Sequence, residues 1–164
     1  MFYKMIENKC NEWYSSERCT VRNLIEYIEK TGQMRDAQIE AIKVYLFLKI
    51  GCECKPLEFL FRYGCFNSIN LNDIELSTAT REYLEENPAA TALFEYSRLT
   101  NDKGEQVSEK LEKQIKKDPS SINYDDFFCK AFYGVSYTDY LFSLPMGAGK
   151  TYLMAAFIYL DLYF

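Results

Sequence analysis

The sequence predicts a mainly α-helical chain whose last part is a single strand–loop–helix unit. Apolar residues recur at intervals of three and four along most of the first 133 residues, which is typical of amphipathic helices. A short run rich in Tyr, Leu and Phe follows at 137–144 and has the composition of a β-strand. Gly-Ala-Gly-Lys-Thr at 147–151 then separates this run from an apolar segment, 151–164, predicted to be a helix.

Two helices are predicted in the first 52 residues. The first covers residues 21–31, with Thr20 as a candidate N-cap and Gly32 as its stop. The second runs from Asp36 to about Ile50 and is apolar on several sides, which predicts that it is widely buried.

Residues 53–134 are predicted to form a helical block with its own core. The expected elements are a short helix between Pro56 and Gly64, two helices at 78–86 and 89–99, a charged helix along Val107, Leu111 and Ile115, and a helix from Ile122 to about Tyr133 capped by Ser121. The third part, 135–164, would hold the strand, the glycine loop and the last helix.

The amino-acid composition excludes several classes of function. Apolar residues make up 48% of the 164 residues, and 14 Tyr and 12 Phe supply large side chains for a core. The net charge of −5 argues against a broadly basic surface for nucleic acid. The chain has no His, which excludes His-based catalytic triads and His metal ligands.

The cysteines and the N-terminus indicate a cytoplasmic protein. Residues 1–7 lack the apolar run of a signal peptide, so the six cysteines are expected to be reduced thiols. Cys52-x-Cys54 with Cys65 is a weak candidate for a zinc site, because its spacing does not form paired hooks and no fourth ligand is obvious. No membrane span is expected, since the most apolar stretch, 151–160, is about half of the ~20 residues required.

Two charged features of the middle block each have a structural and a functional interpretation. The lysines at 110, 113, 116 and 117 could contact phosphates, although such a run is more often a solvated helix face. Asp125 and Asp126 could form a catalytic carboxylate pair, but acids are also favoured in the first turn of a helix by the helix dipole.

The glycine-rich segment carries the clearest chemistry. Glycines let successive backbone N–H groups point into one hollow, and the positive end of the following helix attracts anions. Lys150 would then pair with the β- and γ-phosphates of a nucleotide, and the Thr151 hydroxyl would bind Mg²⁺. The strict phosphate-loop (Walker A) pattern requires Gly or Ala at position 144, where this chain has Leu.

Ser-Leu-Pro-Met-Gly-Ala-Gly-Lys-Thr at 143–151 resembles motif I of superfamily 2 DEAD/DEAH-type helicases, in which the first glycine is commonly replaced. Met-Arg-Asp-Ala-Gln-Ile-Glu-Ala-Ile at 34–42 resembles the Arg-x-x-Gln element that precedes motif I, most closely in restriction-enzyme motor subunits. In that family the glutamine lies against adenine, so the resemblance gives Gln38 an adenine contact, which its amide can make as donor and acceptor.

The resemblance implies an N-terminal fragment of an ATP-dependent helicase or translocase, possessing the first β–P-loop–α unit of an incomplete RecA-like α/β domain. The cofactors would be ATP and Mg²⁺, with Thr151 as the metal-binding residue. Its nucleotide-binding residues would be Arg35, Gln38, Met146, Gly147, Ala148, Gly149, Lys150 and Thr151.

Two departures from the family define the other expectations. Gln38 and Lys150 are 112 positions apart, so 53–134 would be an insertion. The Mg²⁺-binding acid box and the second motor domain are not in this chain, so we expect no ATP turnover by it, nucleic-acid contact through other parts of a full-length protein, and possible self-association of the exposed C-terminal segment. The alternatives are another P-loop NTPase fragment, or a helical interaction module without nucleotide function.

Overall fold

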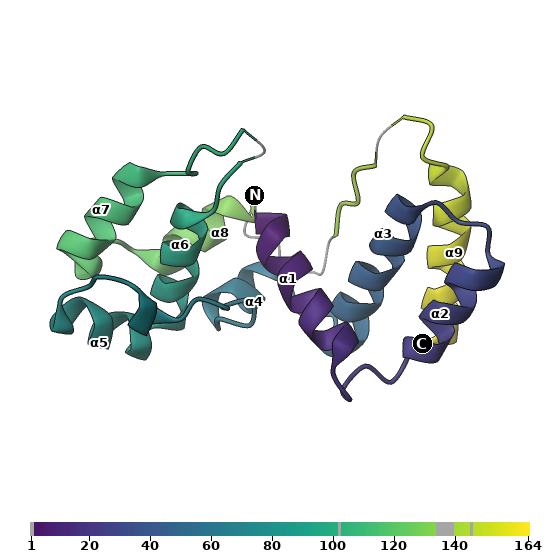
Figure 1. Cartoon of the computed structure of the whole chain (residues 1–164), viewed down its shortest axis with the longest axis horizontal. Coiled ribbons are helices and arrows are strands. Elements are labelled where there is room, and N and C mark those ends of the chain that lie inside the picture. The colour runs from purple at the N-terminus through teal and green to yellow at the C-terminus, as the bar shows by residue number, and fades with distance from the viewer. Residues whose placement is uncertain (1, 102, 134–139, 145) are drawn as a thin grey trace. The chain divides into compact units, whose positions relative to one another are not determined.

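The computed structural model describes residues 2–101, 103–133, 140–144 and 146–164, and this part of the chain is mainly helical (Figure 1). Its α-helices are α1 (Phe2–Ser15), α2 (Arg22–Thr31), α3 (Asp36–Leu46), α4 (Leu57–Arg62), α5 (Thr78–Glu86), α6 (Pro88–Arg98), α7 (Glu109–Lys117), α8 (Tyr124–Ala131) and α9 (Lys150–Tyr163). The chain divides into two compact units. The first unit combines Met1–Lys9 with Pro56–Thr138, and the second combines Cys10–Lys55 with Asp139–Phe164.

Helix α1 is the element that the sequence analysis missed. Its buried positions are Met5, Ile6, Cys10 and Trp13, which recur at helical spacing. The polar residues between them hide this pattern, because six Lys, Glu and Asn residues are interspersed among the apolar residues of the helix.

The first unit is built around α6, which contacts α4, α5, α7 and α8. Its core is aromatic: the Phe61 ring lies 4.8 Å from that of Phe66 and is stacked 5.8 Å from that of Phe128, and all three residues are fully buried. Leu93 and Phe94 of α6 are also fully buried. The prediction that this stretch is mainly helical is confirmed for its described residues, in which the only bridge is an isolated pairing of Thr100 with Gln106.

Side-chain caps mark the starts of three helices in the first unit, α5, α7 and α8. Ser77 accepts a hydrogen bond from the Thr80 amide at the start of α5. The predicted cap of the last helix of this unit, Ser121, is wrong. Ser121 belongs to a 3-10 turn, and Asn123 caps α8 by accepting from the Asp126 amide. Ser121 does not cap α8 because it is the last residue of the turn at 119–121, whereas Asn123 has an extended backbone directly before the helix.

In the second unit, α3 packs against α2 and against α9 (Figure 1). Ile42 and Leu46 of α3 are fully buried, and the helix continues into a π-helical turn, η1 (Phe47–Gly51). The Trp13 ring lies 5.6 Å from the Phe47 ring over this turn. The wide burial predicted for 36–50 is therefore confirmed, whereas its last turn is π-helical because the backbone there bonds five residues back, as from Cys52 N to Phe47 O.

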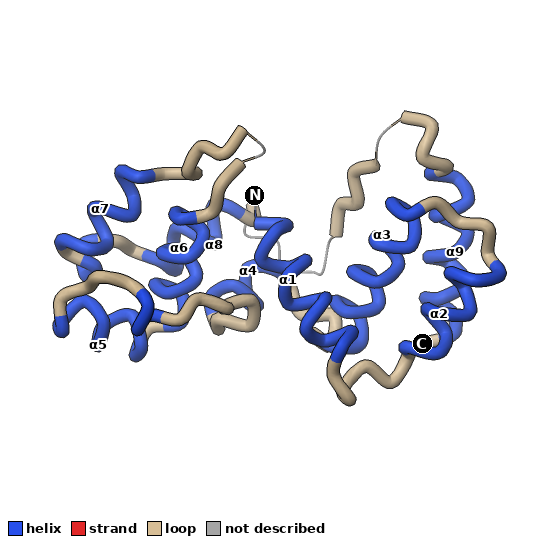
Figure 2. The backbone as a smooth tube through the Cα atoms, viewed as in Figure 1, coloured by secondary structure: helices blue, strands red, loops and turns tan. Residues whose placement is uncertain are grey.

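The predicted strand is wrong for the residues that the structure describes. Residues 140–144 are an irregular segment, and no strand is present in the described ranges (Figure 2). A strand is stable only when a neighbouring strand satisfies its backbone N–H and C=O groups, and none is described beside 140–144. Residues 137–139 of the predicted run lie outside the described ranges. The β–P-loop–α unit is thus reduced here to a loop followed by α9.

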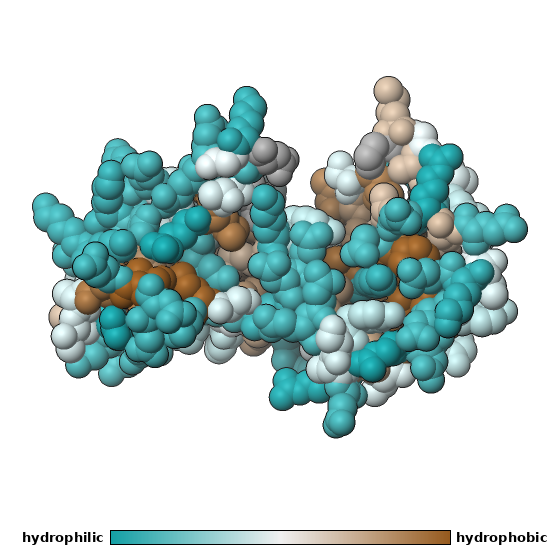
Figure 3. Space-filling model, in the orientation of Figure 1, coloured by the Kyte–Doolittle hydropathy of each residue, from teal (hydrophilic) through white to brown (hydrophobic). Residues whose placement is uncertain are grey.

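None of the described helices is long and apolar enough to cross a membrane. Apolar surface nevertheless interrupts a mostly hydrophilic exterior (Figure 3). In α9, Met154, Ile158 and Leu162 are 61%, 60% and 83% exposed, while Leu153 and Leu160 on the opposite side are buried. Helix α9 is therefore apolar on more sides than the second unit covers.

Candidate phosphate-binding site

The glycine loop is closed by two residues in the left-handed region. Gly147 has a φ of 77° and Gly149 has a φ of 73°, so both positions favour glycine. Gly149 is the N-cap of α9, and its carbonyl accepts the amides of Tyr152 and Leu153. The sequence therefore places its glycines where the chain turns into the helix, as a phosphate loop requires.

The groups that would meet an anion are accessible. Lys150 and Thr151 form the first turn of α9 and are exposed, and a helix of 14 residues presents the positive end of its dipole here. The first amides of a helix lack partners within that helix. Ala148 is buried and Met146 is 97% exposed, so the Met146 side chain extends into solvent from the loop.

The structure brings the predicted Arg-x-x-Gln element to this loop. The Gln38 Nε2 atom donates to the Gly149 carbonyl at 2.9 Å, and the Arg35 guanidinium donates to the Gly147 carbonyl. Gln38 is 3% exposed although it is polar. The two segments are separated by more than 100 residues in the chain, so only the fold of the second unit makes them neighbours.

Gln38 also caps its own helix. It is the third residue of α3, and its Oε1 atom accepts from the Arg35 amide at 2.8 Å, as a capping-box glutamine does. The donor end and the acceptor end of the amide are thus both engaged by protein groups. The adenine contact implied by the resemblance would have to use the one remaining N–H and the remaining lone pair.

A second set of contacts holds the other end of α9. Tyr45 Oη donates to the Asp161 carboxylate at 2.8 Å, and Lys49 pairs with the same carboxylate. The hydrogen bond from Lys49 is the main reason that the pKa of Asp161 lies below its ordinary value. The Tyr45 ring also stacks on Phe157 at 4.7 Å. Helix α9 is therefore held near both of its ends by residues of α3, of the N-cap of α3 and of η1.

The residues present fit a phosphate better than they fit a metal ion. The Thr151 hydroxyl is exposed beside Lys150, so it could reach a cation held by a nucleotide. No group of three or more His, Cys, Asp or Glu side chains with metal-binding geometry occurs among the described residues. Mg²⁺ would therefore need phosphate oxygens and water for most of its ligands.

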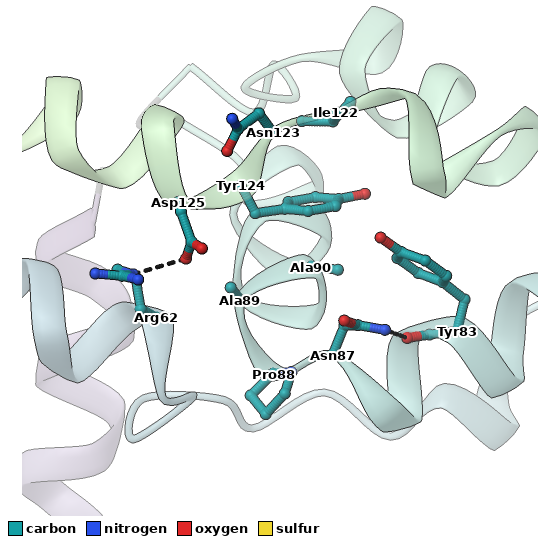
Figure 4. Close-up of a pocket in the computed structure, with 10 residues that line it drawn as sticks. All are labelled: Arg62, Tyr83, Asn87, Pro88, Ala89, Ala90, Ile122, Asn123, Tyr124 and Asp125. Atoms are coloured by element: carbon teal, nitrogen blue, oxygen red, sulfur yellow. Dashed lines mark hydrogen bonds and ion pairs between the residues drawn. The ribbon is translucent and has the colours of Figure 1, made fainter.

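The carboxylate pair considered in α8 is divided between two cations. Asp125 accepts from Arg62 Nε at 2.7 Å, and Asp126 accepts from Lys130 at 2.6 Å. Each acid has its own cationic partner, which favours the structural interpretation of these acids over a catalytic pair. Arg62 and Asp125 line an open hollow of about 360 Å³ in the first unit, together with the rings of Tyr83 and Tyr124 (Figure 4).

Two of the four lysines of α7 form ion pairs with acids of their own helix. Lys113 pairs with Glu109 at 3.1 Å and Lys116 with Glu112 at 2.9 Å, both at the i,i+4 spacing expected from the sequence. These contacts favour the interpretation of a solvated helix face over a phosphate-binding track.

The cysteines are spread between the surface and the interior, and none of the six forms a disulfide. Cys52 is buried, whereas Cys54 and Cys65 are exposed. Burial, and next the nearby Glu40 carboxylate, raise the pKa of Cys10 to about 12.

Comparisons with protein-family models, with curated proteins and with solved structures find no match to this chain.

Sequence reasoning missed the residues that fasten α9. Tyr45, Lys49 and Asp161 belong to no motif, and Asp161 lies more than 100 positions after the other two in the chain. Tyr152, whose hydroxyl donates to the Gly32 carbonyl at 3.1 Å, is a further case. No signal in a single sequence links such positions, because their contacts depend on tertiary packing.

Proposed function

We propose that this chain is the nucleotide-binding N-terminal part of an ATP-dependent helicase or translocase, of the kind found in restriction and defence systems. The observation that carries the proposal is the meeting of the Arg-x-x-Gln element with the glycine loop, through Gln38 and Gly149. Both segments were assigned to one motor family from their sequences alone. Their contact supports that assignment because separate, incidental motifs would have no reason to lie together.

The chemistry of the loop supports a triphosphate as ligand. Two glycines with positive φ, an exposed Lys150 and the start of a long helix provide amides, a positive charge and a favourable dipole. ATP is the expected nucleotide, with Mg²⁺ bound between its phosphates and the Thr151 hydroxyl. DNA or RNA would be engaged elsewhere in a full-length motor.

This chain is proposed to bind ATP without turning it over. Phosphoryl transfer needs a metal held by a carboxylate and a positioned water in addition to a phosphate cradle. Asp125 and Asp126 are each paired with a cation in the first unit and precede the loop, so they are poor substitutes for an acid box.

Binding of Mg-ATP to the wild-type chain, to Lys150→Ala and to Lys30→Ala tests the proposal. Lys30 is an exposed lysine of the same unit that pairs with Glu26, so its variant controls for the loss of one positive charge. We expect Lys150→Ala to weaken binding at least tenfold and Lys30→Ala to have little effect. Equal affinity of wild type and Lys150→Ala, or no binding by wild type, would favour the helical interaction module instead.

Hydrolysis is measured on the same three proteins. Turnover of about 1 per second or more, lost in Lys150→Ala, would contradict the fragment assignment, because it would require a complete catalytic site.

A further inference from the structure

Two side chains at the start of α3 hold two carbonyl groups of the loop. Arg35 donates from its guanidinium to the Gly147 carbonyl, and Gln38 donates from Nε2 to the Gly149 carbonyl at 2.9 Å. Gly147 and Gly149 flank Ala148, so the loop backbone is held to the start of α3 on both sides of Ala148. The loop has no other described side-chain hydrogen bond to its backbone.

Holding a carbonyl also orients the next amide. In a trans peptide group the C=O of one residue and the N–H of the next point in opposite directions, and no cis peptide bond occurs in the described chain. Arg35 therefore turns the Ala148 amide away from itself, and Gln38 does the same for the Lys150 amide. Amides turned outward from α3 are what an anion would need at this loop.

Most of the hydrogen-bonding capacity of the Gln38 side chain is used by protein groups and cannot serve to recognise a base. Its Oε1 atom accepts from the Arg35 amide, its Nε2 atom donates to Gly149, and the residue is 3% exposed. An adenine edge is recognised through an accessible donor and acceptor together. A buried amide that is engaged at both ends is better suited to positioning the loop.

We propose that Arg35 and Gln38 are positioning residues that preset the phosphate loop, so that the site recognises the triphosphate group and not the base. This inference depends on the proposed function for its ligand, and it extends the ligand class to any nucleoside triphosphate and to inorganic tripolyphosphate. The adenine contact of Gln38 becomes the competing explanation.

Gln38→Glu tests the contact with the loop separately from the helix cap. Glutamate at the third helical position retains the oxygen that caps the Arg35 amide, so α3 keeps its capping box. It loses the donor to Gly149 and places a negative charge beside that carbonyl. Arg35→Ala removes the other loop contact, and Lys30→Ala again controls for the loss of a charge.

Affinities for ATP, GTP and tripolyphosphate are measured with each variant. We expect Arg35→Ala and Gln38→Glu to weaken all three ligands by the same factor, roughly tenfold, because a hydrogen bond that orders the loop affects any phosphate equally. A loss confined to ATP in Gln38→Glu would overturn the inference and assign adenine reading to Gln38. Unchanged affinities in both variants would also overturn it.

Hydrogen exchange without ligand separates this inference from the proposed function. We expect peptides covering 146–152 to exchange several times faster in Arg35→Ala and Gln38→Glu than in wild type, with no change in Lys30→Ala. Unchanged exchange would overturn the positioning role even if the wild type binds nucleotide. Faster exchange together with no binding by the wild type would uphold the loop contacts and reject the phosphate ligand.

Discussion

Substituting Gly149 by Ala tests the packing of the loop against α3. A Cβ atom at this position would lie 2.7 Å from Gln38 Nε2, well inside van der Waals contact, at a φ of 73°. Gly147 has a similar φ of 77°, but a Cβ atom there would meet nothing within 4 Å. The two substitutions therefore share a backbone cost and differ in the collision with Gln38.

The expected magnitudes follow from these contacts. A non-glycine residue in the left-handed region costs about 1–2 kcal/mol, which is the whole effect expected for Gly147→Ala. In Gly149→Ala the Gln38 amide must also move, although its other end is held by the Arg35 amide. Breaking that buried arrangement adds about 1–3 kcal/mol. Gly149→Ala should thus lower the free energy of unfolding by about 2–5 kcal/mol.

Urea unfolding followed by tryptophan fluorescence measures this difference. Trp13 is the single tryptophan of the chain, it is 7% exposed, and it belongs to the second unit with the loop. In the double variant Gln38→Ala with Gly149→Ala the collision is absent, so the two changes should be less destabilising together than the sum of each alone. Equal midpoints for Gly147→Ala and Gly149→Ala would refute the reasoning.

Three further outcomes are expected. The pKa of Asp161 is lower in the folded chain than its ordinary value of about 3.9. The carboxylate therefore stabilises the fold at pH values above about 3.9, and this stabilisation is lost as the pH falls through the lower folded pKa. Wild type should lose more stability than Asp161→Asn in acid unfolding curves. Phe61→Ala leaves a cavity in the core of the first unit and should cost about 3–5 kcal/mol by circular dichroism melts. Mass spectrometry after brief alkylation at about pH 8 should find Cys129 modified and Cys10 intact, because the pKa of Cys10 is raised to about 12 and the residue is buried.

Most of the helices could be predicted from the sequence because their signals are local. The predicted limits of 78–86 match α5, and Pro88 begins α6 as proline in a first turn should. The start of α8 was misplaced by two residues because Ser121 and Asn123 are both good caps, and only the turn before them decides between them.

The strand failed for a reason that lies outside the segment. Residues 140–144 have strand-like composition, but a strand depends on a partner that a local pattern does not reveal. The two segments of the candidate site were predicted separately. The loop was predicted from its glycines, and the Gln38 element was predicted from a resemblance to a family. Its fastening through Tyr45 and Asp161 was not, since nothing local connects them.

The most direct test of the central claim, that residues 147–151 bind phosphate, is an NMR titration of the ¹⁵N-labelled chain with ATP and with tripolyphosphate. The largest shifts should occur at the amides of Ala148, Gly149 and Lys150, and Lys150→Ala should abolish them while Lys30→Ala retains them. Shifts that are absent from these amides, or that are largest at Lys110 and Lys113 of α7, would contradict the account.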